Sequence, residues 1–206
     1  WTGSMNYTLT DGYLNDNNLV RIRSAELAES FTREFEEMFL EDRFGALSLA
    51  DTPRRTPVVA GTQLEVYFSP DDEPAARLVE LVLEARESVE FLAFSFTLDP
   101  LREALVERAV QGVRVRGVIE TDQAGNAGSE LTALREAGLD VRLDGNPRNM
   151  HHKVIVIDGS VVITGSYNFS TSAEESNDEN VLIVHSGDIA SLFLIEFERV
   201  FDLAAP

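Results

Sequence analysis

The chain has 206 residues and a formal net charge of −19, and 44% of its residues are apolar. This length allows one sizeable hydrophobic core, or one domain with part of another, and no apolar run is long enough to span a bilayer. The absence of cysteine excludes disulfides and thiolate metal sites, and the acidic balance argues mildly against tight binding of nucleic acid.

The beginning of the chain repeats its end. Residues 2–39 align without a gap on residues 164–201, at a constant offset of 162. In both copies a Gly-Ser-x-Asn turn leads through a polar loop into a short strand, expected at 19–22 and 181–184, and then into a helix. Apolar residues recur every four positions in both helices, which predicts that these faces pack into a core. They are Leu27, Phe31, Phe35 and Phe39, and Ile189, Phe193, Phe197 and Phe201.

Strands and helices alternate through the rest of the chain. Residues 41–62 have little periodicity and are expected to form a linker. Strands are predicted at 63–68, 89–96, 113–119 and 139–143, and helices at 74–86, 100–111 and 129–137. A hairpin is predicted from 152–157 to 161–164 because Asp158-Gly159 favours a two-residue turn. The pattern predicts an α/β layered fold, with helices flanking a mixed, mostly parallel β-sheet.

The repeat also predicts the domain organisation. At an offset of 162, the first-copy equivalents of His151 and Lys153 would lie upstream of Trp1. We therefore expect residues 1–40 to be the C-terminal remnant of a first repeat, 41–62 a linker, and 63–206 a complete second repeat. The chain starts without a signal-peptide pattern and looks internal, so localisation stays open.

The chemistry is expected around His151 and Lys153. Residues two apart on a strand face the same side, so these two side chains project together while His152 points to the packed side. Lys153 is the only lysine beside sixteen arginines. Its retention indicates a position that needs a compact point charge rather than a guanidinium fork.

Further residues follow at specific separations: Asp158, then Gly165-Ser166-Tyr167-Asn168, then Glu179. The whole set resembles the active-site motif of the phospholipase D (HKD) superfamily, especially its branch of small bacterial endonucleases and mitochondrial cardiolipin hydrolases. The resemblance covers essentially all of residues 63–203 and is far more specific than a lone His-x-Lys. It implies a phospholipase D-like layered fold, with the two repeats related by a pseudo-twofold axis.

The resemblance implies that phosphodiesters are cleaved in two steps, without a metal or cofactor. One histidine forms a phosphohistidine, and the partner histidine protonates the leaving oxygen and then activates water or an alcohol. In the family the first motif usually supplies the nucleophile, so His151 is expected to be the general acid or base. Glu179 is expected to orient its ring. Asp158 is counted with the catalytic motif, although its distance along the strand favours a structural role.

The same resemblance implies which side chains bind the phosphate. Lys153 and Asn168, supported by Ser166, would hold the non-bridging oxygens, and the first copy would add Ser4 and Asn6. The other His-x-Lys would come from a missing N-terminal half or from a second chain. One departure stands out: the first copy has Asn17 where the second has Glu179, and an amide offers no negative charge to an imidazolium.

Three functions are left open. A phospholipase D-type phosphodiesterase acting on phospholipids is slightly favoured, because the chain is acidic. A metal-independent endonuclease is suggested by Arg142, Arg148 and Lys153 near the motif. A non-catalytic scaffold is suggested by Asn17 and the absent first motif. Export, or association with the cell envelope, is suggested only by analogy with bacterial relatives, and the balance between hydrolysis and transfer to an alcohol is not determined.

Overall fold

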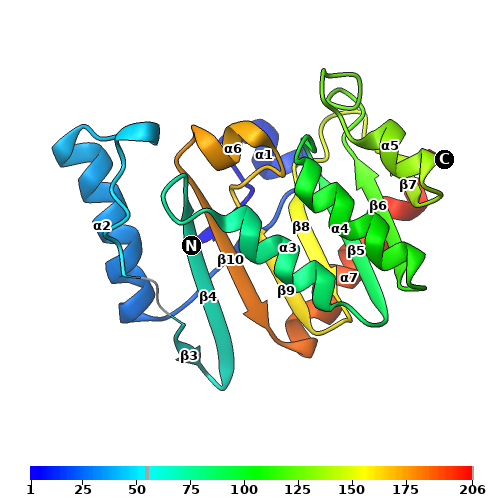
Figure 1. Ribbon diagram of the computed structural model, residues 1–206. Coiled ribbons are helices and arrows are strands. Elements are labelled where there is room, and N and C mark those ends of the chain that lie inside the picture. Colours follow the sequence, from blue (N-terminus) through cyan, green and yellow to red (C-terminus); the bar gives the residue numbers. More distant parts are fainter. Residues whose placement is uncertain (54–55, 206) are drawn as a thin grey trace.

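A single eight-stranded β-sheet forms the centre of the computed structural model, which describes residues 1–53 and 56–205 (Figure 1). The strand order is β3-β4-β10-β9-β8-β5-β6-β7. The strands span Val58–Val59 (β3), Thr62–Ser69 (β4), Ser88–Ala93 (β5), Arg114–Ile119 (β6), Asp140–Leu143 (β7), Lys153–Ile157 (β8), Val161–Gly165 (β9) and Glu179–His185 (β10). The predicted layered α/β class with a mixed sheet is confirmed.

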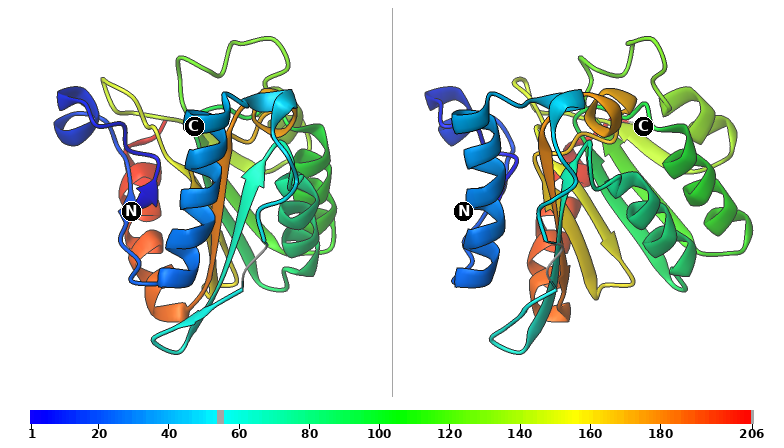
Figure 2. Two further views of the ribbon diagram at one scale, coloured as in Figure 1. Left: turned by 90° about the vertical axis from the view of Figure 1, so that its left-hand side faces the viewer. Right: turned by 60° about the vertical axis from the view of Figure 1, so that its left-hand side comes forward.

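Helices cover both faces of this sheet (Figure 2). One face carries α3 (Pro74–Glu84), α4 (Asp99–Val110) and α5 (Leu131–Glu136), and the other carries α7 (Gly187–Leu203). Successive strand residues alternate between the two cores: Phe91 packs towards α3 and α4, and Leu92 packs towards α7. Burial on both faces explains why the central strands are continuous apolar runs. No helix within the described residues is long and apolar enough to cross a membrane.

The expected predominance of parallel strand pairs is wrong. Only β5–β6 and β6–β7 pair in parallel, through the crossover helices α4 and α5, and every other neighbouring pair in this sheet is antiparallel. The reason is topological. β4 and β5 are joined by a crossover through α3 but are not adjacent, and β10, β9 and β8 fill the gap between them. Periodicity along the chain carries no information on such an insertion.

Most predicted elements of residues 63–203 are observed with small shifts at their ends; α3, for example, stops at Glu84 rather than Arg86. The predicted linker contains a short 3-10 helix, Gly45–Leu47, and the edge strand β3, neither of which was predicted. Residues 54–55 and 206 of the predicted linker and second repeat lie outside the described residues.

The sequence repeat is also a structural repeat. The N-terminal segment forms β1 (Thr2–Gly3), α1 (Leu9–Tyr13), β2 (Leu19–Val20) and α2 (Ala25–Glu41). At the offset of 162, α1 coincides with α6 (Thr171–Glu175) and α2 with α7, residue for residue. The N-caps match as well, since Thr8 and Ser24 correspond to Ser170 and Ser186, and each of the four accepts a backbone N–H through its hydroxyl.

The two repeated helices differ in what covers them. Phe197 and Phe201 of α7 are buried against the sheet, as predicted. Their counterparts on α2, Phe35 and Phe39, are 56% and 72% exposed, so the predicted core packing is wrong for these two residues, whereas Leu27 is buried and Phe31 packs against the core. On α2, the ring of Phe31 meets that of Phe68 in the sheet edge-on at 5.0 Å.

Candidate active site

Residues from both ends of the chain line one cavity of about 270 Å³. The first copy (residues 2–39) contributes Gly3, Ser4, Met5 and Asn6. The C-terminal unit (residues 63–205) contributes His151, Lys153, Ser166, Asn168 and Glu179. The cavity thus brings together every residue predicted to be catalytic or phosphate-binding except Asp158.

The His151 ring is held by the first copy. Its Nδ1 lies 2.9 Å from the Ser4 carbonyl oxygen and 3.2 Å from Asn17 Oδ1. The orientation of the Asn17 amide follows from its Nδ2, which donates to the carbonyl oxygen of Asp11 at 3.0 Å. Since both neighbours of Nδ1 are acceptors, we assign the ring proton to Nδ1 and a lone pair to Nε2.

Lys153 lies against the other ring nitrogen. Its Nζ is 3.1 Å from His151 Nε2 and 3.0 Å from the His151 carbonyl oxygen. The side chain is only 3% exposed, and the ammonium sits 4.7 Å from the centroid of the Phe94 ring. Burial lowers the pKa of Lys153 to about 7, against the opposing charges of Glu179 and Asp11. An incoming anion would therefore favour the protonated form of Lys153.

Burial and the neighbouring Lys153 charge also lower the pKa of His151, while the hydrogen bond to the Ser4 carbonyl acts in the opposite direction. The ring is therefore neutral near pH 7 and offers an unprotonated Nε2. Nucleophilic attack or general-base catalysis requires this form. Phe94, to which the sequence analysis gave no role in the site, packs its ring 4.6 Å from the imidazole and supports it from one side.

Next to the cavity, the two copies meet through a local twofold relation. Thr2 Oγ1 donates to Asn180 Oδ1, and the equivalent Thr164 Oγ1 donates to Asn18 Oδ1 at 2.9 Å. Equivalent residues thus exchange equivalent contacts, the signature of an isologous interface.

Serines and glycines of the two turns hold these contacts in place. The hydroxyls of Ser4 and Ser166 each accept a backbone N–H at 3.0 Å, from Asn18 and Asn180 respectively. A Cβ at Gly165 would lie 2.1 Å from the Asn180 carbonyl oxygen, so only glycine allows this approach. Both predicted phosphate-binding serines therefore also have a structural task.

Glu179 was predicted to orient the His151 ring, and this prediction is wrong: Asn17 of the first copy occupies that place. Glu179 lines the cavity, accepts from Asn177 Nδ2 at 3.3 Å, and acts electrostatically on Lys153. Sequence reasoning paired residues within one repeat, whereas the local twofold pairs them across repeats.

Asp158 lies outside the cavity, and its inclusion among the catalytic residues is corrected. It stands in the turn between β8 and β9, where its carboxylate accepts the backbone N–H groups of Arg86, Glu87 and Ser88 at 2.8–3.2 Å. Four hydrogen bonds of this kind tie the hairpin to the start of β5. Asp158 is thus the structural member of the motif.

The other histidine of the motif is structural too. His152 is buried, with Nε2 at 3.0 Å from Glu196 Oε1 and Nδ1 at 3.2 Å from Asn18 Nδ2. It faces the packed side, as the alternation along the strand predicted. Within the described part of the chain, no group of three or more His, Asp or Glu side chains could hold a metal ion.

A family model and several curated relatives match more than half of this chain. A family model described as "Cardiolipin synthase, PLD-like domain" matches residues 78–201. The mitochondrial cardiolipin hydrolase of Mus musculus is 41% identical over 155 residues, which are 75% of this chain and 69% of that protein. The Homo sapiens protein of the same name is 41% identical over 131 residues, which are 64% of this chain but only 52% of that protein.

The fold also matches a solved structure. Nuc from Salmonella typhimurium, described as a phospholipase D family member, has a TM-score of 0.66 and 28% identity, covering 70% of this chain and 97% of that one. The two relatives compared by sequence are mammalian, so they do not support the expected bacterial affiliation. From the matched family model, the shared fold and the identity to these relatives, the chain belongs to the phospholipase D-like family.

Proposed function

We propose that the protein containing this chain hydrolyses phosphodiesters in the cavity between the first copy and the C-terminal unit, with His151 as one of two catalytic histidines. The observation that carries the proposal is the state of the His151 ring. Its Nδ1 is tied to Ser4 and Asn17, and its Nε2 faces the cavity beside the Lys153 ammonium. A bound phosphodiester would draw the ammonium to a non-bridging oxygen and release the Nε2 lone pair.

The chemistry proceeds by two displacements at phosphorus. One histidine attacks, a P–N bond forms, and the leaving oxygen departs with a proton from the other histidine. Water, deprotonated by that second histidine, then attacks phosphorus and breaks the P–N bond. The family resemblance assigns His151 to the acid or base role, whereas its neutral ring also suits a nucleophile. Trapping the phosphorylated enzyme and locating the phosphohistidine by mass spectrometry decides between these roles.

We assign the second histidine to a partner half, and the local twofold supports a position for it beside Glu179. Glu179 is the counterpart of Asn17, which holds His151, so Glu179 would hold the ring of the partner histidine in the same way. We accordingly interpret residues 1–40 as the end of a first repeat, 41–62 as a linker and 63–206 as the second repeat.

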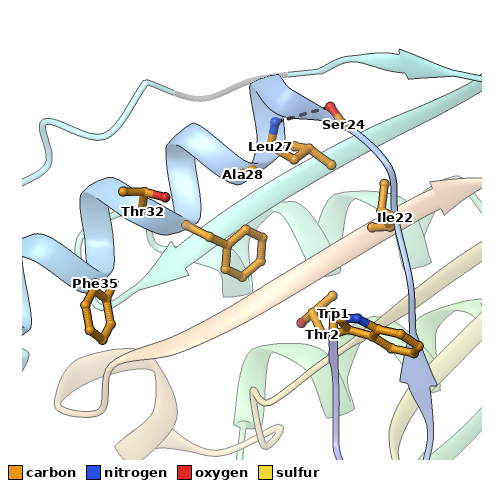
Figure 3. A pocket seen from close by; sticks show the side chains of 9 residues that line it. Trp1, Thr2, Ile22, Ser24, Leu27, Ala28, Thr32 and Phe35 are labelled. Carbon is orange, nitrogen blue, oxygen red and sulfur yellow. Dashed lines mark hydrogen bonds between the residues drawn. The ribbon is translucent and has the colours of Figure 1, made fainter.

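The bare face of α2 supports a partner half. Trp1, Ile22 and Phe35 line a hollow of about 300 Å³, and Figure 3 shows their side chains between α2 and the N-terminal strands. The equivalent face of α7 is covered by the central sheet. A second sheet placed on α2 in the same way would bury Phe35 as Phe197 is buried.

A phospholipid is the favoured substrate, because the mammalian relatives are named cardiolipin hydrolases. The alternative of an endonuclease drew on three cations near the motif. One of them, Arg142, is engaged elsewhere: it pairs with Asp140 at 3.2 Å and lies over the Phe201 ring. To test the endonuclease alternative, single-stranded DNA serves as the competing substrate.

The test is hydrolysis of bis(p-nitrophenyl) phosphate in EDTA by the protein with both halves present. We expect turnover by the wild type and a loss of about 1,000-fold or more in His151→Ala. His185→Gln is the matched control, since His185 pairs with Glu65 away from the cavity. Equal turnover by His151→Ala, or complete inhibition by EDTA, would refute the mechanism.

Vesicles containing cardiolipin and single-stranded DNA are then compared as substrates. Faster cleavage of the lipid supports the proposed substrate class, and faster cleavage of DNA supports the endonuclease. Inactivity on all diesters would leave the scaffold function.

A further inference from the structure

The two copies place their carboxylates differently. The first copy has Asn17 where the second has Glu179, and Asp11 where the second has Ala173, both pairs at the offset of 162. Each copy therefore has one carboxylate at these two positions taken together. This carboxylate lies on a different secondary-structure element in each copy. In the first copy it lies on α1, and in the second it lies at the start of β10.

Asp11 organises the polar loop that carries Asn17. It is 7% exposed, its Oδ1 accepts from Asn15 Nδ2 at 2.6 Å and from Asn17 Nδ2 at 3.3 Å, and its carbonyl oxygen accepts from Asn17 Nδ2 at 3.0 Å. These bonds turn the Asn17 oxygen towards His151 Nδ1. The backbone N–H of Asp11 donates to Thr8 Oγ1 at 3.1 Å, which fixes the carboxylate to the start of the helix.

We propose that Asp11 is a positioning residue for His151, which acts through Asn17 and supplies the negative charge that Asn17 lacks. Asn17 accepts the hydrogen bond from the His151 ring. Asp11 provides the negative charge, on the far side of the Asn17 amide. Together they do what Glu179 alone is placed to do for the partner histidine. The loss of a carboxylate at position 17 is thus compensated at position 11.

The charges around the ring fit this division of roles. The Asp11 carboxylate acts to raise the pKa of His151, against burial, Lys153 and His152, which lower it. In turn, burial acts to raise the pKa of Asp11, but hydrogen bonds from Asn15, Asn6 and Asn17 hold it below its ordinary value. Asp11 therefore stays ionised when His151 becomes protonated, which stabilises the imidazolium formed during catalysis. Glu179 acts on the neighbouring Lys153, on which Asp11 also acts.

The decisive experiment is an NMR titration of His151 in the chain of residues 1–206, which needs no substrate. Asp11→Asn keeps an acceptor for Asn15 and Asn17 but removes the charge. We expect it to lower the His151 pKa by about one unit, with the proton still on Nδ1. Glu175→Gln, which removes an exposed carboxylate from α6, is the control and should leave the His151 titration unchanged.

A double variant transplants the arrangement of the second copy. Asp11→Ala with Asn17→Glu recreates the Ala173 and Glu179 pair, and we expect it to return the His151 pKa to the wild-type value or above. Asp11→Ala alone should lower the pKa and also loosen the ring, seen as broadened His151 signals. An unchanged pKa in Asp11→Asn, or no recovery in the double variant, would overturn the proposal.

The kinetic readout rests on the proposed function. In Asp11→Asn, the limb of the kcat/KM profile controlled by His151 should move to lower pH by the same amount as the NMR pKa, with little change in KM. If the wild type cleaves no diester, the proposed function fails while the NMR result still decides the role of Asp11. If Asp11→Asn lowers the His151 pKa seen by NMR but does not shift the limb of the kcat/KM profile, Asp11 has only a structural role.

Discussion

At the scale of single residues, the Lys153 ammonium lies in the cavity wall and is almost completely buried. Lys153 is buried against Phe94 and His151, and among the described residues its Nζ has hydrogen bonds only to the His151 backbone and ring. A buried cation without a carboxylate at hydrogen-bond distance costs free energy in the folded state. Such a cost is reasonable where a phosphate anion is to be bound, because the anion restores the missing partner.

Substitutions of Lys153 should therefore separate activity from stability. Lys153→Met removes the buried charge, so we expect activity to be lost but the free energy of unfolding at pH 6 to rise by roughly 1–2 kcal/mol. Lys153→Arg keeps the charge but does not fit the enclosed site, and it should lower kcat/KM by about 100-fold or more. Urea denaturation and steady-state kinetics measure the two effects.

The stability gained in Lys153→Met should depend on pH. The pKa of Lys153 in the folded state, about 7, lies below its ordinary value, so between these values the unfolded chain binds a proton that the folded chain has released. Stability of the wild type therefore rises with pH from about 7 towards 10 through this group. The advantage of Lys153→Met should be largest below pH 7 and vanish near pH 10. An advantage that is constant with pH would contradict this assignment.

At the scale of elements, the β8–β9 hairpin presents the motif, and its turn is tied to the loop before β5. Asp158 and Gly159 both have positive φ, 49° and 56°, as a tight two-residue turn requires. The Asp158 carboxylate receives the N–H groups of residues 86–88, which precede β5 or begin it. These hydrogen bonds fix the position of β8 along β5, and hence the positions of His151 and Lys153.

Asp158→Ala should destabilise the fold by about 1–3 kcal/mol, because several backbone donors lose their acceptor. The kcat of the remaining folded protein should stay within about twofold of wild type, since Asp158 lies outside the cavity. Urea denaturation with parallel kinetics tests this. A large loss of kcat at unchanged stability would return Asp158 to the catalytic residues.

Acid should reduce the contribution of Asp158. Although burial acts to raise its pKa, the hydrogen bonds from Ser88, Glu87 and Arg86 hold the pKa of Asp158 below its ordinary value. The stabilisation is therefore complete above the unfolded-state pKa and is lost as pH falls through the folded-state pKa. The difference in stability between wild type and Asp158→Ala should accordingly shrink below about pH 4.

At the scale of the whole molecule, a strongly acidic chain surrounds the proposed phosphate-binding site. The net charge of −19 repels an anionic vesicle or a nucleic acid at long range. Salt screens this repulsion beyond about 8–10 Å at physiological ionic strength. Basic nucleic-acid binders lose affinity as salt rises. This protein should behave in the opposite way.

We expect KM for anionic vesicles to fall as ionic strength rises from low to physiological values. The kcat for bis(p-nitrophenyl) phosphate should change little, because this small substrate meets mainly the local field of the cavity. Vesicle assays at a series of salt concentrations measure the slope. A KM that rises with salt would point to a basic surface elsewhere in the protein that dominates the approach.

The family resemblance named most of the residues that line the cavity, together with Asp158, which lies outside it. The sequence by itself determined the local and repeated features: the helices other than α1 and α6, the Asp158-Gly159 hairpin and the internal repeat. These depend on periodicity, turn chemistry and spacing, which act over short stretches of chain. Only the tertiary structure decided that β8, β9 and β10 insert between β4 and β5, that Asn17 rather than Glu179 holds His151, and that Asp11 stands behind Asn17. The physical reason is common to all three: they depend on which distant segments lie side by side, and here a twofold relation brings each repeat against the other.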